Sequence, residues 1–212
     1  MTKTFNIKTE YVNWGPYVMK TTVPKHITDK LKREGEKTKH NYNHKLAGQL
    51  DHQFLYPPDV QKWFYNTMTP YIQAYRDGHC KFHALDRLNV EFSADDLWVN
   101  FMKPGDFNPL HTHGGDYSFV LFVDVPKELE KEQERFAGTG AEPGSLLFEY
   151  TQQAKPRWAT TGHSVRPKTG DFYMFPALLQ HWVCPFKSKV TRISVSGNLA
   201  IINKDKLPRD YF

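Results

Sequence analysis

The spacing of hydrophobic residues divides the chain into a first part with helical patterns and a later part with strand patterns. From Pro57 to Tyr75, apolar side chains recur at three- and four-residue intervals, which predicts an amphipathic helix that begins at Pro57-Pro58-Asp59. We expect Pro70 to kink or divide this helix, because proline has no backbone N–H to donate. A second, shorter helix is expected at Pro24 to Arg33, where apolar residues form a narrow stripe.

After residue 86, short runs of aromatic and β-branched residues alternate with turn signals such as Pro104-Gly105 and Thr169-Gly170. This texture is typical of an all-β sandwich or barrel. The charged segment Pro126 to Arg135 predicts a solvated helix inserted between strands. At least five strands are predicted, at Leu97 to Met102, Tyr117 to Val125, Ser145 to Thr151, Asp171 to Phe175 and Thr191 to Ile202.

The length of 212 residues suits one domain with a full hydrophobic core. We therefore expect a single domain over residues 1–212. Within it, residues 1–85 are expected to form a helical N-terminal support region, residues 86–202 a β core and residues 203–212 a C-terminal tail.

Composition indicates a soluble protein. Hydrophobic residues make up 39% of the chain, the mean hydropathy is -0.64, and no long apolar run is present, so no membrane span is expected. The N-terminus lacks the pattern of a signal or transit peptide, which predicts a cytoplasmic location. In a reducing compartment, Cys80 and Cys184 are expected to be free thiols.

The net charge of +5 does not by itself indicate nucleic-acid binding. The 28 basic residues are scattered among 23 acidic ones, and the densest basic cluster, Lys30 to Lys37, contains two glutamates. A solvated helix face explains that cluster better than a binding stripe does. Nucleic acid is therefore an unexpected partner, and the sequence leaves the oligomeric state open.

Three histidines form the first candidate site. His111 and His113 are two residues apart, and strand side chains at that spacing project from one face. His181 follows about seventy residues later at the start of another predicted strand, and strands distant in sequence can be neighbours in a barrel. We therefore predict one metal ion bound by all three imidazoles. Imidazole suits iron, zinc, copper and nickel, so the ligand type leaves the metal open.

A cation is expected near this metal. Arg192 stands eleven residues after His181, on the strand that returns into the predicted barrel. A buried guanidinium needs an anionic partner, and a carboxylate matches its fork. Ser194, on the same strand face, can add a hydroxyl. A protein carboxylate is one possible partner for Arg192, but the order of the residues favours a small dicarboxylate.

Four segments carry a resemblance to a known family: WVNFMKPGDFNPLHTHGGDYSFVLFVDVP, PGSLLFEY, VRPKTGDFYMFPALLQHWVCPF and TRISVSGN. Together they resemble the iron(II)- and 2-oxoglutarate-dependent oxygenases, in particular a phage and bacterial prolyl-hydroxylase-like branch. The resemblance covers residues 97–202, about half of the chain. It implies a mainly β fold with flanking helices around a double-stranded β-helix, a jelly-roll of the cupin-like type.

The resemblance also assigns roles to individual residues. His111 corresponds to the first iron ligand, His181 to the distal ligand, and Arg192-Ile193-Ser194 to the anchor of the co-substrate carboxylate. Asn100 and Tyr173 are further candidates for contact with the co-substrate, and barrel packing explains them equally well. The implied cofactors are Fe(II), 2-oxoglutarate and O2. The implied reaction is hydroxylation of a C–H bond in an unidentified substrate, such as peptidyl proline or a small metabolite.

One position departs from the family pattern. His113 stands where the family carries an aspartate or glutamate, so the ligand set becomes three histidines unless Asp116 serves as the second ligand. We favour His113, because Asp116 lies beyond Gly114-Gly115 and five residues from His111. Water in place of the carboxylate is a third possibility. A neutral third ligand leaves the metal more positive, which is expected to weaken oxygen activation.

Two other classes of function stay open at this point. One is a cupin-like three-histidine metalloenzyme that does not use 2-oxoglutarate, and Arg192 is the residue that discriminates against it. The other is a non-enzymatic barrel that serves as a binding module. A purified protein that takes up no metal would favour this alternative. The segment Asn43 to Leu50 lies outside the regular patterns and is either a lid or substrate loop or a simple connector.

Overall fold

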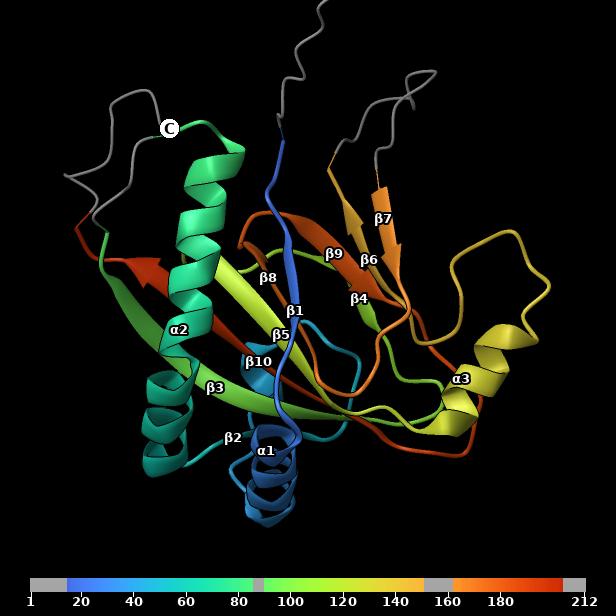
Figure 1. The fold of residues 1–212 in the computed structure, drawn as a ribbon. Coiled ribbons are helices and arrows are strands. Elements are labelled where there is room, and N and C mark those ends of the chain that lie inside the picture. Colours follow the sequence, from blue (N-terminus) through green and yellow to red (C-terminus); the bar gives the residue numbers. More distant parts are fainter. Residues whose placement is uncertain (1–14, 86–89, 151–161, 204–212) are drawn as a thin grey trace, which may run out of the picture.

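The structure is a computed structural model that describes residues 15–85, 90–150 and 162–203. These residues form two antiparallel sheets (Figure 1). The larger sheet has the order β1 (Met19–Thr22), β8 (Asp171–Pro176), β5 (Tyr117–Asp124), β10 (Arg192–Ile201), β3 (Phe92–Met102) and β2 (Gln53–Leu55). The smaller sheet has the order β4 (Asn108–His111), β9 (Gln180–Val183), β6 (Leu146–Glu149) and β7 (Gly162–Val165).

The predicted fold class, mainly β with flanking helices around a jelly-roll core, is confirmed. All five predicted strands are present as β3, β5, β6, β8 and β10, with bounds that differ by a few residues. The predicted start of a strand near His181 is β9. The short strands β1, β2 and β7 were not predicted, because three or four residues carry too little alternation to stand out. Since β1 and β2 precede residue 86, the N-terminal region supplies strands as well as helices.

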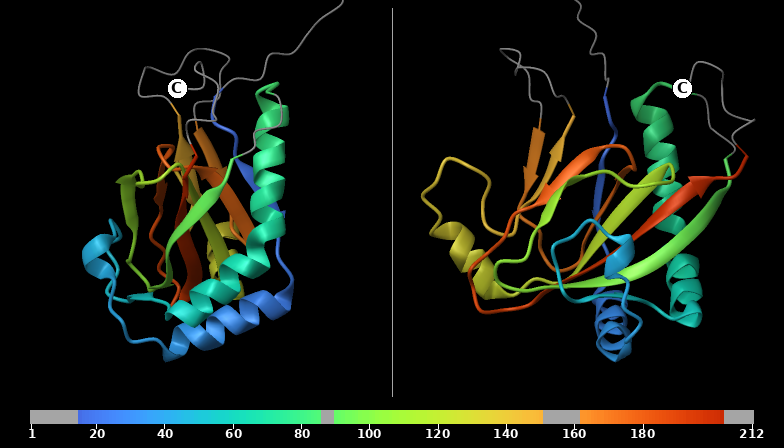
Figure 2. Two further views of the ribbon diagram at one scale, coloured as in Figure 1. Left: turned by 90° about the vertical axis from the view of Figure 1, so that its left-hand side faces the viewer. Right: turned by 180° about the vertical axis from the view of Figure 1, so that it is seen from behind.

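Helices α1 (Lys25–Lys37) and α2 (Pro58–Phe82) lie on one side of the larger sheet, and the smaller sheet lies on the other side (Figure 2). Leu31 and Phe64 are fully buried in the core between the helices and the sheet. Burial of such side chains stabilises the fold by about 2 kcal/mol each. Pro70 does not divide α2, which runs on as one helix and bends along its length (Figure 2).

The remaining helices are short. α3 (Lys127–Glu134) occupies the charged segment for which a helix was predicted, and η1 (Asn43–Lys45) is a single turn of 3-10 helix. Within the described residues, no helix has both the length and the apolar character needed to cross a membrane. Cys80 and Cys184 are buried free thiols, as predicted.

Alternation along β3 and β10 decides which residues reach the space between the sheets. Val99 and Val195 point to the helices and join the core there. Asn100 and Ser194 point the opposite way and line a pocket between the sheets. Because side chains alternate in a strand, Arg192 shares the inner face with Ser194. The period-two pattern therefore puts polar groups on the inner face of an otherwise apolar sheet.

Candidate active site

His111 and His181 meet across the smaller sheet. β4 pairs with β9, and in that ladder the Cα atoms of His111 and His181 are direct partners. Their ring centroids lie 4.3 Å apart. The strand pairing therefore brings together two imidazoles that are far apart in the sequence.

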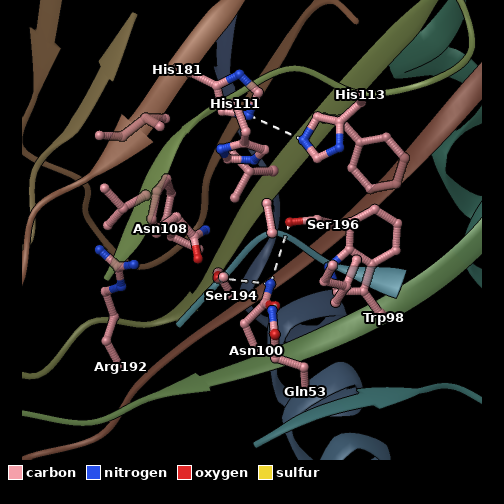
Figure 3. Close-up of a pocket in the computed structure, with 18 of the residues that line it drawn as sticks. Gln53, Trp98, Asn100, Asn108, His111, His113, His181, Arg192, Ser194 and Ser196 are labelled. Atoms are coloured by element: carbon pink, nitrogen blue, oxygen red, sulfur yellow. Dashed lines mark hydrogen bonds between the residues drawn. The ribbon is translucent and has the colours of Figure 1, made fainter. Parts of the chain in front are cut away.

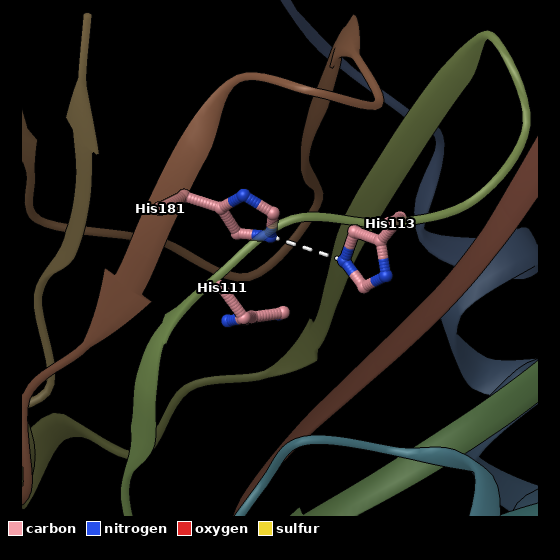
Figure 4. A group of neighbouring side chains, drawn as sticks. All are labelled: His111, His113 and His181. Atoms are coloured by element: carbon pink, nitrogen blue, oxygen red, sulfur yellow. Dashed lines mark hydrogen bonds between the residues drawn. The ribbon is translucent and has the colours of Figure 1, made fainter. Parts of the chain in front are cut away.

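His113 reaches the same place from a loop. β4 ends at His111, so the expectation that both histidines project from one strand face is wrong in this detail. The backbone N–H of His113 donates to the carbonyl of Ala177 at 2.9 Å, which fixes the loop against the turn between β8 and β9. The Nε2 atoms of His113 and His181 lie 3.1 Å apart (Figure 4).

The three histidines form a group that can hold a metal ion. One ligand nitrogen of each lies within 4.8 Å of the others, and among the described residues no carboxylate or thiolate belongs to this group. Asp116, the alternative second ligand, accepts a hydrogen bond from the backbone N–H of Ile201 at 2.7 Å. Its carboxylate is thus engaged at the end of β10, and the structure does not bring it to the histidines.

Backbone carbonyls orient two of the rings. Nδ1 of His111 lies 2.7 Å from the carbonyl oxygen of Pro109, and Nδ1 of His181 lies 2.8 Å from that of Leu179. A carbonyl only accepts, so both Nδ1 atoms carry the proton, and Nε2 of each neutral ring has a lone pair. This is the tautomer of a metal ligand whose second nitrogen is held by a hydrogen bond.

The local electrostatics keep these rings neutral. Burial lowers the pKa of His113 to about 3 and that of His181 to about 4, and the proximity of the other imidazoles lowers both further. Burial also lowers the pKa of His111. A histidine must be deprotonated to bind a metal, and burial in the fold keeps these three imidazoles deprotonated before any metal binds. The donor set therefore fits a divalent transition metal.

Arg192 is a buried cation with incomplete hydrogen bonding. Its Nη1 donates to the carbonyl of Gly144 at 2.7 Å, and its Nη2 lies 2.9 Å from Sδ of Met102. Nε has no partner, and within the described part of the chain no carboxylate forms an ion pair with this guanidinium. Burial lowers the pKa of Arg192 to about 10, so the group is still charged at neutral pH. An unpaired buried charge is costly, which indicates that an anion belongs beside it.

Two of the other predicted co-substrate contacts lie at this pocket. Ser194 and Asn100 are partners in the β10–β3 ladder, and Asn100 Nδ2 donates to Ser194 Oγ at 3.4 Å. Tyr173 does not line the pocket. It lies on β8, which β5 separates from β10, and its hydroxyl is hydrogen-bonded to Lys20. The structure therefore gives Tyr173 a place in the core instead of at the site.

The histidines and Arg192 line one and the same pocket (Figure 3). Figure 3 shows the imidazoles at one end, Arg192 at the other and Asn108 between them. The segment Leu46 to Gly48 forms part of the wall, so the segment proposed as either lid or connector lies at the pocket. Three polar residues that line the pocket were not predicted from the sequence: Gln53, Asn108 and Ser196.

Of these three, only Ser196 carried a signal in the sequence. It is two residues beyond Ser194 on the same strand, so alternation predicts the same face. Gln53 belongs to a strand of three residues, and Asn108 begins a strand of four. Neither strand is long enough for its faces to be assigned from the sequence alone.

Comparison with protein families matches residues 96–198 to the family described as "Putative 2OG-Fe(II) oxygenase". No curated protein matches the chain. The structure is similar to a prolyl-4-hydroxylase from Pseudomonas putida, with 15% identity, a TM-score of 0.56, and coverage of 86% of this chain and 91% of the other.

Two further solved structures share the fold. A viral collagen prolyl hydroxylase from Paramecium bursaria Chlorella virus-1, in complex with 2-oxoglutarate, has 15% identity, a TM-score of 0.53, and coverage of 86% of this chain and 94% of the other. HygX from Streptomyces hygroscopicus, with nickel and 2-oxoglutarate bound, has 10% identity, a TM-score of 0.55, and coverage of 90% and 84%. At these identities the likeness concerns the fold.

Proposed function

We propose that this chain, which belongs to the 2OG-Fe(II) oxygenase family, hydroxylates a C–H bond of a substrate bound in the pocket of Figure 3. Enzymes of this family use iron(II), 2-oxoglutarate and O2. In this proposal His111, His113 and His181 hold the iron. Arg192 and Ser194 hold the far carboxylate of 2-oxoglutarate. The observation that carries the proposal is that a neutral three-histidine group and an unpaired buried cation line one pocket.

Each residue has a defined task. The imidazoles present neutral nitrogens, Arg192 binds and orients a carboxylate through Nε and the remaining N–H groups, and Ser194 can donate its hydroxyl to the same anion. When bound, iron(II) is the centre at which O2 is activated at the expense of 2-oxoglutarate. Phe119, Phe122 and Phe175 form apolar parts of the pocket wall.

The unpaired guanidinium also favours this proposal over a cupin-like enzyme without 2-oxoglutarate. A three-histidine metal centre alone has no use for a buried cation on the neighbouring sheet. A dicarboxylate that reaches from the metal to Arg192 gives that cation its missing partner. The printed titles of the viral hydroxylase and HygX structures name bound 2-oxoglutarate, which supports the same ligand here.

Peptidyl proline is the first substrate class to test, since two structures of the same fold are described as prolyl hydroxylases. Small metabolites are the second class. The coarse reaction, oxidation coupled to conversion of 2-oxoglutarate into succinate, is the same for both.

Succinate release from 2-oxoglutarate, measured with iron(II) in air, tests this function. We expect wild-type protein to form succinate, with stimulation by a true substrate. His181→Ala should abolish the signal, whereas His26→Ala, which changes an exposed histidine on α1, should not. Equal succinate formation by wild type and His181→Ala would contradict the proposed metal site.

A further inference from the structure

Two buried acceptors at the pocket have no donor. Oε1 of Gln53 and Oδ1 of Asn108 are both buried and without a hydrogen-bond partner in the described part of the chain. Both residues line the pocket. They also lie close together, because a Cβ placed on Gly48 would collide with Oδ1 of Asn108 and would lie 3.1 Å from Nε2 of Gln53.

Unsatisfied buried acceptors are uncommon in folded proteins and call for a partner. The glycine at position 48 lets the segment Leu46 to Gly48 approach both side chains without filling the space between them. The side chains of Gln53 and Asn108 therefore lie together beneath one wall of the pocket, where a bound group with N–H or O–H donors can supply the missing hydrogen bonds.

A chain of hydrogen bonds connects Gln53 to the proposed co-substrate anchor. Nε2 of Gln53 donates to Oδ1 of Asn100 at 2.8 Å, and Nδ2 of Asn100 donates to Oγ of Ser194 at 3.4 Å (Figure 3). A carboxylate beside Arg192 only accepts, so Ser194 must donate to it and use its lone pair for Asn100. Because Asn100 donates to Ser194 through Nδ2, its Oδ1 accepts from Nε2 of Gln53, and Oε1 of Gln53 is left as an acceptor without a donor among the described residues.

The charge of the pocket narrows the class of ligand. Among the described residues that line the pocket, Arg192 is the one ionised side chain, and no aspartate, glutamate or lysine contributes. The proposed function uses Arg192 for 2-oxoglutarate. A second ligand with a free ammonium or phosphate group would have to bury that charge without a partner, at a high cost in free energy.

We propose that the primary substrate binds through uncharged donors, amide N–H groups or hydroxyls, that each donate one hydrogen bond to Gln53 or to Asn108 beneath the segment Leu46 to Gly48. This inference rests on the proposed function and specifies its substrate. It assigns Gln53 as a specificity-determining residue. It favours N-acylated or peptide-linked amino acids and neutral hydroxyl compounds over free amino acids and phosphorylated metabolites.

The test compares four sets of probes in the succinate assay: N-acetyl amino acid amides, neutral methyl glycosides, free amino acids and sugar phosphates. At least one of the two uncharged sets should give saturable stimulation, and the set that does so distinguishes an amide from a hydroxyl donor. Stimulation by the charged sets alone, or by none of the four, would overturn the inference.

Two variants check the role of Gln53. Gln53→Met keeps the length of the side chain and removes both polar atoms. It should raise the KM for the stimulating probe about tenfold, as expected for one buried hydrogen bond. Gln73→Met, at an exposed position on α2, is the matched control and should leave KM unchanged. An unchanged KM in Gln53→Met would also overturn the inference.

Binding of 2-oxoglutarate to zinc-loaded protein, measured by calorimetry without turnover, separates this inference from the proposed function. Wild type should bind 2-oxoglutarate, and Gln53→Met should retain measurable binding, weakened because the hydrogen bond from Gln53 to Asn100 is lost; retained binding also shows that the variant is folded. If neither binds 2-oxoglutarate, the proposed function fails. If both bind it and no uncharged probe is used, the substrate inference alone fails.

Discussion

His111 and His181 are direct partners across the β4–β9 ladder, with their ring centroids 4.3 Å apart. Each ring is also held at Nδ1 by a backbone carbonyl two residues earlier in its own strand or turn. The small sheet therefore fixes both the positions and the tautomers of two proposed ligands. The third, His113, depends on a loop.

The choice between His113 and Asp116 as the second ligand leads to a direct prediction. His113→Ala should reduce bound iron or zinc strongly, because it removes one of three clustered nitrogens. Asp116→Ala should leave metal content near that of wild type, since its carboxylate binds the N–H of Ile201 instead. Metal analysis after dialysis against limiting zinc measures both. Loss of metal in Asp116→Ala alone would reverse the assignment.

The loop that carries His113 depends on Gly115. This residue has φ of +84°, and a Cβ there would lie 2.9 Å from the backbone oxygen of Leu199. Gly105 also has a positive φ, of +87°, but a Cβ there meets nothing within 4 Å. We expect Gly105→Ala to cost about 1 kcal/mol of stability from backbone strain alone. Gly115→Ala should cost more, about 2–4 kcal/mol, because its Cβ also collides with backbone.

Thermal unfolding and zinc affinity distinguish the two glycine variants. Gly115→Ala should also weaken zinc binding, because it displaces the loop two residues from His113, whereas Gly105→Ala should not. Equal effects of the two substitutions on zinc affinity would show that this turn does not position the ligand.

Stability without metal should fall as the pH drops below about 6.5. Burial lowers the pKa of His79 and His181 to about 4 and that of His113 to about 3. Between these values and the ordinary pKa of about 6.5, the unfolded chain binds more protons than the folded chain, so stability rises with pH. At pH 5.5 each of these histidines should lower the free energy of unfolding by about 1 kcal/mol relative to its value at pH 7.5 or above.

Urea unfolding of metal-free protein between pH 5 and 8 measures this dependence. His79→Phe should make the plot of the free energy of unfolding against pH shallower, because the contribution of one histidine in this pH range is lost. A stability that is flat from pH 8 to pH 5 would show that these imidazoles are not held neutral by the fold.

The sequence could predict the parts of the site that lie on strong local patterns. The His111-Thr112-His113 spacing and the position of Arg192 beyond His181 indicated residues that the structure brings to one pocket. Alternation along β10 explains why Arg192 and Ser194 face the same way. The common face of Arg192 and Ser194 depends on neighbours in sequence and on a regular strand, which is why it can be inferred without coordinates.

Other parts of the site depend on pairings that no local pattern encodes. Gln53 reaches the pocket because β2 is added to the edge of the larger sheet beside Asn100, and β2 has only three residues. Tyr173 was a candidate for contact with the co-substrate, with packing in the barrel as the alternative, and the strand order places β5 between it and Arg192. Strand order in a sheet is a property of the whole fold, so a residue on the correct face can still be two strands away from the site.

Arg192 should be important for function and unimportant for stability. The fold buries this charge without an anion among the described residues, so its removal also removes a desolvation cost. We expect Arg192→Met to change the free energy of unfolding by less than about 1 kcal/mol. Phe122→Ala, whose ring lies 5.3 Å from the same guanidinium, should cost about 3–5 kcal/mol as a buried aromatic lost from the core.

Urea unfolding in the absence of 2-oxoglutarate compares these two variants. If Arg192→Met proved as destabilising as Phe122→Ala, the guanidinium would be a structural element with its partners already in place, and the case for an external anion would weaken.

One ligand, 2-oxoglutarate, is expected to join the histidine-bound metal to Arg192, and anaerobic calorimetry of its binding distinguishes this arrangement from the alternatives. Iron(II)-loaded wild type should bind 2-oxoglutarate, Arg192→Met should bind it about 10–100-fold more weakly, and metal-free wild type should also bind more weakly. Arg33→Met, which changes an arginine on α1, is the control and should match wild type. Equal affinity of wild type and Arg192→Met, or no binding by the iron-loaded wild type, would contradict the account.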